Sequence, residues 1–131
     1  MNLTEFSKEV HRNAVNHGWW ETEPTFGEII ALCHSELSEA LQEYRAWADL
    51  DRVYYDLSGC GDRTLEKCAD CYQGHIKCAK AKPYGPAVEL ADCILRILDI
   101  CGRYDIDIET VLMKKHEHNK TRSYRHGEKR L

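Results

Sequence analysis

The sequence lacks several features that would place it in a large class of proteins. Its 131 residues contain no apolar run near the roughly 20 residues that a membrane-spanning helix needs. The first residues do not have the charged-then-apolar layout of a secretory signal. No internal repeat or low-complexity stretch occurs. We therefore expect a single cytoplasmic domain over residues 1–131.

An overall excess of positive charge is also missing. The formal net charge is −4, which argues against a general nucleic-acid-binding surface, and we expect neither nucleic acid nor membrane as a partner. Basic residues gather instead near the C-terminal end: Lys114, Lys115, Lys120, Arg122, Arg125, Lys129 and Arg130. This segment suits an anionic ligand, and the alternative is a solvated basic tail.

A disulfide framework is not expected, because the seven cysteines of a cytoplasmic chain are thiols or metal ligands. Four of them lie close together with one histidine: Cys60, Cys68, Cys71, His75 and Cys78. Cys68 and Cys71 form one C-x-x-C unit, but the second unit of a paired zinc knuckle is absent. A structural Zn²⁺, with His75 as a substitute ligand, could order this segment. A redox pair at Cys68 and Cys71 and a set of inert thiols are the alternatives.

Apolar residues recur at helical spacing in four segments of the chain. We predict helices over residues 3 to about 17, 25 to about 47, 86 to about 101 and 108 to about 122. Gly18 and Gly102 should end the first and third helices, and Asp107 should cap the start of the last one. Thr25 opens a capping box at the start of the second helix. Residues 82–86 are predicted to form a turn before the third helix.

Two acidic pairs lie in the second and third predicted helices. Glu36 pairs with Glu39, and Glu89 pairs with Asp92, each at i,i+3 spacing that puts both carboxylates on one helix face. Desolvated carboxylates are costly without a cation, and donor sets made only of oxygen favour Mg²⁺ or Mn²⁺ over zinc. If the two helices face each other, the pairs predict a divalent-metal site. Otherwise they are ordinary solvated acidic faces.

The three tryptophans are candidates for stacking on a nucleobase: Trp19, Trp20 and Trp47. Trp19 and Trp20 are adjacent in a predicted loop, which is uncommon. The structural alternative for this pair is that one ring fills the core and the other covers a helix end.

Taken together, these motifs resemble the MazG-like all-α nucleoside triphosphate pyrophosphohydrolases. The resemblance covers roughly residues 3–48 and 82–130 and is carried by Ser35-Glu36-Leu37-Ser38-Glu39-Ala40, Val88-Glu89-Leu90-Ala91-Asp92, Lys115, Asn119, Arg122, Tyr124 and His126-Gly127. Two features depart from the family. Ser35 stands where relatives can carry a further Glu, and the gap between Glu39 and Glu89 is longer than usual. We therefore expect residues 50–80 to be a cysteine-rich insertion between the second and third helices.

The resemblance implies an all-α, four-helix-bundle-like protein that forms a homodimer or homotetramer. It implies Mg²⁺ or Mn²⁺ held by the catalytic residues Glu36, Glu39, Glu89 and Asp92. Apart from the resemblance, one of these carboxylates could accept the proton of the attacking water, and Glu39 is a candidate for that role. It implies phosphate binding by Lys115, Asn119, Arg122 and Tyr124. The implied reaction cleaves a (d)NTP between its α- and β-phosphates to give a nucleoside monophosphate and pyrophosphate. The alternatives are a non-catalytic nucleotide-binding sensor or adaptor and a helical zinc-binding interaction protein.

Overall fold

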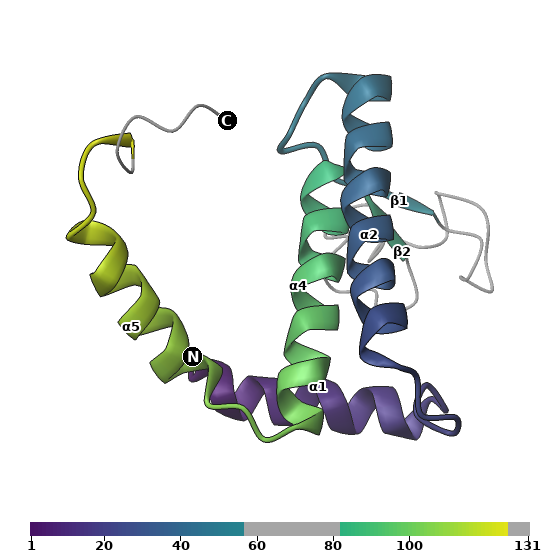
Figure 1. Cartoon of the computed structure of the whole chain (residues 1–131). Coiled ribbons are helices and arrows are strands. Elements are labelled where there is room, and N and C mark those ends of the chain that lie inside the picture. The colour runs from purple at the N-terminus through teal and green to yellow at the C-terminus, as the bar shows by residue number, and fades with distance from the viewer. Residues whose placement is uncertain (57–81, 126–131) are drawn as a thin grey trace. The chain divides into compact units, whose positions relative to one another are not determined.

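The computed structural model describes residues 1–56 and 82–125 (Figure 1). This part of the chain is mostly helical, and its elements are α1 (Leu3–Asn16), α2 (Phe26–Trp47), β1 (Tyr54–Asp56), β2 (Lys82–Tyr84), α4 (Pro86–Arg103) and α5 (Ile108–Lys120). The predominantly helical class predicted from the sequence is confirmed, whereas the two short strands were not predicted. None of the described helices combines the length and apolar character that crossing a membrane requires.

Most helix ends lie within a residue or two of their predicted positions, because the local capping signals were correct. After α1, Gly18 adopts a φ of +81°, and its N–H donates to the Val15 carbonyl at 3.0 Å. The N–H of Trp19 donates to the Ala14 carbonyl at 3.1 Å, which completes a Schellman motif. At the start of α5, the Asp107 side chain accepts from the N–H of Thr110 at 3.2 Å, as expected of an N-cap.

Gly102 does not end its helix, so the sequence prediction was wrong at this position. Helix α4 continues through Gly102 to Arg103. A Cβ atom placed on Gly102 would overlap the backbone carbonyl oxygen of Ser7 in α1. Glycine therefore serves here to let the backbones of α1 and α4 approach closely rather than to terminate the helix.

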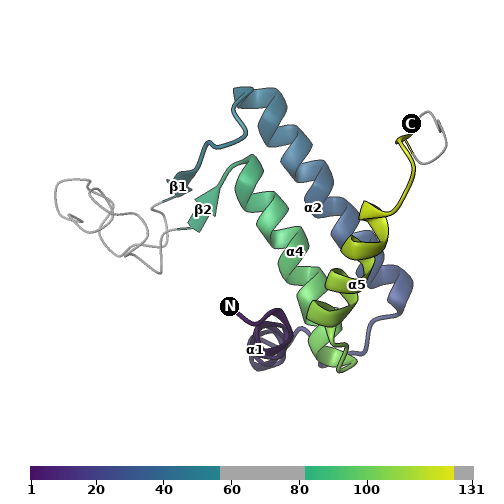
Figure 2. The ribbon, with the colours of Figure 1, turned by 90° about the vertical axis from the view of Figure 1, so that its left-hand side faces the viewer.

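The described residues belong to two compact units. Unit 1 combines Met1–Thr25 with Leu95–Leu131, and unit 2 comprises Phe26–Ile94. In unit 2, α2 and the first part of α4 run side by side in opposite directions (Figures 1 and 2). Its described part buries Ile29, Cys33, Ala40 and Cys93, together with Pro86 at the start of α4. In unit 1, Leu98, Ile100 and Cys101 of α4 are buried together with Ser7 of α1.

The two strands of unit 2 form an antiparallel pair beside the ends of the helices to which they connect. Tyr54 lies opposite Tyr84, and Asp56 lies opposite Lys82. Residues 82–84 are therefore strand rather than part of the predicted turn. The turn is confined to Gly85, which joins β2 to α4 and has a φ of +129°. Aromatic residues favour strands, but the pairing depends on partners that are distant in sequence.

Candidate metal centre

Three carboxylates of unit 2 converge on one point. Glu36, Glu89 and Asp92 each offer an oxygen atom, and these three atoms lie within 4.8 Å of one another. Glu36 comes from the middle of α2, and Glu89 lies in the first turn of α4. The i,i+3 spacing of Glu89 and Asp92 puts both on the same face of α4. The structure thus brings together one member of the first acidic pair and both members of the second.

The centre is sheltered from water at two of its three residues. Glu36 and Glu89 are each 6% exposed. Burial raises the pKa of Glu89, and the negative charges of Asp92, Glu39, Glu36 and Glu43 raise it further. A buried carboxylate in this setting is costly unless it binds a proton or a cation.

The remaining acids of α2 extend the negative charge along that helix. Glu39 is exposed and is not one of the three residues whose oxygens converge, although its charge contributes to the raised pKa of Glu89. Glu43 accepts hydrogen bonds from the Tyr54 hydroxyl at 3.0 and 3.2 Å. Glu43 therefore connects the acidic face of α2 to strand β1.

Lys82 of strand β2 was not singled out from the sequence, yet its charge interacts with those of Glu89 and Asp92. Its Nζ lies 4.5 Å from the centroid of the Tyr84 ring. Interaction with Tyr84 is the largest cause that raises the pKa of Lys82, and the charges of Glu89 and Asp92 also raise it. The signal that could have found Lys82 is the pairing of strand-forming tyrosines on either side of the predicted insertion.

Aromatic rings line up between two cations in unit 2, and we call this row the aromatic ladder. Its members in order are Arg52, Trp47, Tyr54, Tyr84 and Lys82. The Arg52 guanidinium lies 3.9 Å from the Trp47 ring centroid. Trp47 contacts Tyr54 edge-on at 6.0 Å, and Tyr54 stacks on Tyr84 at 5.6 Å. Trp47, a stacking candidate, is 46% exposed and already has Arg52 over its ring.

The other two stacking candidates lie in unit 1. Trp19 is 67% exposed. Trp20 is partly buried, and its indole N–H donates to both carboxylate oxygens of Asp99 at 3.1 Å. His11 contacts the same carboxylate through Nδ1 at 2.7 Å and meets the Trp20 ring edge-on at 5.2 Å. These contacts assign Trp20 to the packing of unit 1.

The predicted phosphate-binding residues belong to α5 and the residues after it. Lys115, Asn119, Arg122 and Tyr124 are all exposed. Lys115 and Asn119 lie one turn apart on α5, so they share a face of the helix. They are part of unit 1, whereas the three carboxylates are part of unit 2.

The predicted zinc ligands lie outside the described residues, so the zinc hypothesis stays a prediction. This applies to Cys60, Cys68, Cys71, His75 and Cys78. The cysteines that the structure does describe are Cys33, Cys93 and Cys101, and all three are buried thiols outside any disulfide. Burial raises the pKa of the Cys101 thiol, which makes it less reactive.

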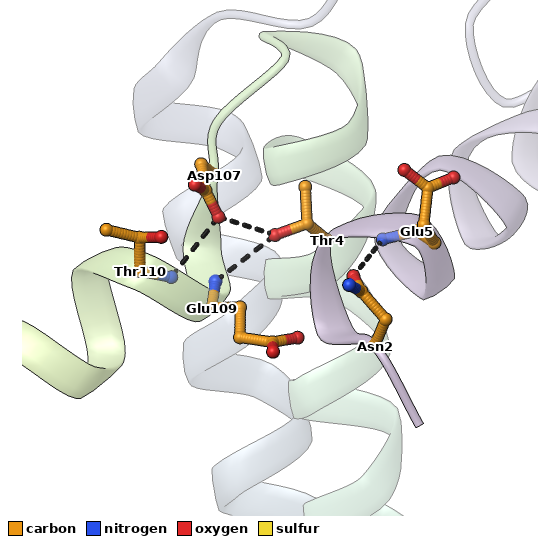
Figure 3. A pocket seen from close by; sticks show the side chains of 6 residues that line it. All are labelled: Asn2, Thr4, Glu5, Asp107, Glu109 and Thr110. Carbon is orange, nitrogen blue, oxygen red and sulfur yellow. Dashed lines mark hydrogen bonds between the residues drawn. The ribbon is translucent and has the colours of Figure 1, made fainter.

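A polar pocket of about 240 Å³ in unit 1 lies where the N-termini of α1 and α5 meet (Figure 3). The Thr4 hydroxyl donates to Asp107 at 2.8 Å and accepts from the N–H of Glu109 at 3.3 Å. Asn2 accepts from the N–H of Glu5 at 2.9 Å. These bonds cap both helices and hold their first turns together, so the pocket is a structural junction.

The chemistry available at the converging carboxylates is that of a hard-cation site. All three donors are oxygens, two of them on buried residues, and among the described residues no histidine or cysteine belongs to the group. Such a donor set fits Mg²⁺ or Mn²⁺ better than zinc.

The chain matches no family model, no curated protein and no solved structure.

Proposed function

We propose that this chain is a Mg²⁺-dependent nucleoside triphosphate pyrophosphohydrolase that cleaves between the α- and β-phosphates. The products are a nucleoside monophosphate and pyrophosphate. The observation that carries the proposal is the convergence of Glu36, Glu89 and Asp92, with oxygens within 4.8 Å, at a point where Glu36 and Glu89 are each 6% exposed.

Glu36, Glu89 and Asp92 would hold the divalent ion, with Glu39 as a further carboxylate beside them. When bound, Mg²⁺ would reduce the negative charge that repels a polyphosphate and would lower the pKa of a bound water. The raised pKa of Glu89 agrees with this role. Neighbouring carboxylates that are meant to share a cation repel one another when no cation is bound, and this repulsion favours the protonated form.

The other residues act on the substrate itself. Glu39 is exposed and is the candidate to accept the proton of the attacking water. Lys115, Asn119, Arg122 and Tyr124 bind phosphate oxygens and stabilise the charge of the departing pyrophosphate. Trp19 and Trp47, which expose 67% and 46% of their surface, are the better candidates to stack on a base.

The proposal includes a homodimer or homotetramer. Helices α2 and α4 of unit 2 leave large apolar side chains exposed, between 36% and 55% of their surface: Ile30, Leu37, Leu41, Leu90 and Ile94. Exposed apolar surface of this extent is typical of a face that packs against another chain.

The decisive experiment supplies Mg²⁺ with each common and damaged (d)NTP and identifies the products. We expect pyrophosphate and a monophosphate for at least one nucleotide. Glu36→Gln and Asp92→Asn should abolish turnover while circular dichroism shows unchanged helix content. Glu39→Gln should lower kcat by about a hundredfold or more, as expected for loss of a general base. Glu9→Gln, an exposed acid of α1, is the control and should keep wild-type activity.

The products separate this proposal from its alternatives. Release of orthophosphate alone, or no turnover across the whole panel, would remove it. Nucleotide binding measured by calorimetry without any product would favour the sensor or adaptor. Zinc that survives Glu36→Gln and is lost in the double variant Cys68→Ser, Cys71→Ser would assign a structural zinc to the cysteine-rich segment.

A further inference from the structure

Strand β2 fixes Lys82 close to the start of the helix that carries Glu89 and Asp92. β2 is joined to α4 through Gly85 alone. Gly85 has a φ of +129°, and a Cβ atom there would overlap the carbonyl oxygen of Arg52. The backbone therefore packs tightly at this joint. The pairing of Lys82 with Asp56 and the stacking of Tyr84 on Tyr54 hold the strand in register.

The ammonium of Lys82 is oriented by Tyr84 and not by a carboxylate in contact with it. It lies 4.5 Å from the Tyr84 ring centroid. Glu89 and Asp92 act on it electrostatically. Lys82 is exposed, so its ammonium is accessible to a ligand from solvent. An accessible cation whose charge acts on two of the carboxylates has the right sign to meet an anion that approaches a bound metal ion.

The net charge of the metal centre with a nucleotide bound indicates a role for Lys82. A divalent ion cannot neutralise three carboxylates and the phosphate chain of a nucleotide together, so the loaded centre stays strongly negative. A fixed cation beside it strengthens binding of the polyphosphate. The same cation repels a divalent ion that binds alone, because like charges disfavour each other over several ångströms. The two effects have opposite signs, which makes them separable by experiment.

We propose that Lys82 binds the phosphate chain of the metal-bound nucleotide and thereby sets the preference of the centre for metal–nucleotide over metal alone. This inference rests on the proposed function, since it assumes that the carboxylates hold a divalent ion. It adds a phosphate-binding residue from unit 2 to the four residues proposed in unit 1.

The test measures binding, so it does not depend on turnover. Mn²⁺ affinity is measured by electron paramagnetic resonance, first alone and then with a non-hydrolysable α,β-imido nucleoside triphosphate. Lys82→Met should bind Mn²⁺ alone about twofold to tenfold more tightly, because a neighbouring positive charge is removed. It should bind the Mn²⁺–nucleotide complex about tenfold more weakly, because a charge-assisted contact is lost. In a turnover assay, KM should rise more than kcat falls.

Two further variants separate charge from structure. Lys82→Arg keeps the positive charge and should restore wild-type values in both binding experiments. Arg52→Met removes the cation at the other end of the aromatic ladder and should change neither affinity. Melting curves identify any variant that unfolds.

The outcomes distinguish the role of Lys82, the metal centre and the proposed reaction from one another. If Lys82→Met leaves both affinities unchanged while the wild-type chain binds Mn²⁺, the role of Lys82 is overturned and the metal centre stands. The same conclusion follows if Arg52→Met has the same effects as Lys82→Met. A wild-type chain that binds no Mn²⁺ overturns both. Opposite changes in the two affinities without any pyrophosphate release would support Lys82 and overturn only the proposed reaction.

Discussion

Among single residues, Glu89 has the most consequential environment. Its carboxyl is buried, is surrounded by other acids and has a raised pKa. The folded chain therefore holds this proton more tightly than the unfolded chain does. Below the ordinary value of 4.5 both states are protonated and nothing is lost. As pH rises from there through the higher folded pKa, the free energy of unfolding falls, because folding then requires a buried charge.

Glu89→Gln tests this reasoning. Without divalent ions, the wild-type chain should lose thermal stability as pH rises from about 4.5 towards neutral, and Glu89→Gln should lose less. The variant should then melt at the higher temperature at neutral pH. With Mg²⁺ added, the order should reverse, because only the wild-type chain keeps the ligand. Melting curves in EDTA and in Mg²⁺ measure both effects, with Glu9→Gln as control. Parallel pH profiles for wild type and Glu89→Gln would contradict the assignment.

Sequence alone could single out the three converging carboxylates but not Lys82. Glu36, Glu89 and Asp92 stand out because each belongs to an i,i+3 pair on an amphipathic helix, and this spacing is local information. Lys82 does not stand out, because its position in the fold depends on the pairing of β2 with β1. No local pattern around a single lysine carries that information.

The elements show the same division between local and long-range information. The helices were predictable because apolar periodicity, the N-cap Asp107 and the Gly18 C-terminal motif all act within a few residues. Strands β1 and β2 have three residues each, and their partners are far apart along the chain. Gly102 was misassigned for a related reason, since the close approach of Ser7 cannot be read from the neighbours of Gly102.

Gly85→Ala tests whether the joint between β2 and α4 requires glycine. An alanine Cβ would overlap the Arg52 carbonyl at a φ of +129°, which L-residues rarely adopt. We expect the free energy of unfolding to fall by about 1–3 kcal/mol, measured by urea denaturation. Gly27→Ala in α2 is the matched control, because a Cβ there meets nothing within 4 Å. It should be neutral or stabilise by up to about 1 kcal/mol. Equal effects of the two substitutions would contradict the role given to Gly85.

At the scale of the whole molecule, the described helices expose many large apolar side chains. The buried hydrophobic residues among the described part of unit 2 include Ile29, Cys33, Ala40 and Cys93. Its helices meanwhile expose leucine and isoleucine side chains on α2 and α4. Covering this exposed apolar surface with another copy of the chain would add to its stability. This balance supports the proposed dimer or tetramer independently of the reaction.

Leu41→Glu tests the proposed assembly. Leu41 is 49% exposed on α2, so a charge there is easily hydrated in a monomer but is costly at an apolar interface. We expect light scattering after size exclusion to give a dimer or tetramer for the wild-type chain and a smaller species for Leu41→Glu. Gln42→Glu adds a charge at the next exposed position and should leave the mass unchanged. A wild-type chain that is monomeric at all concentrations would leave these apolar side chains exposed to water and would overturn the assembly.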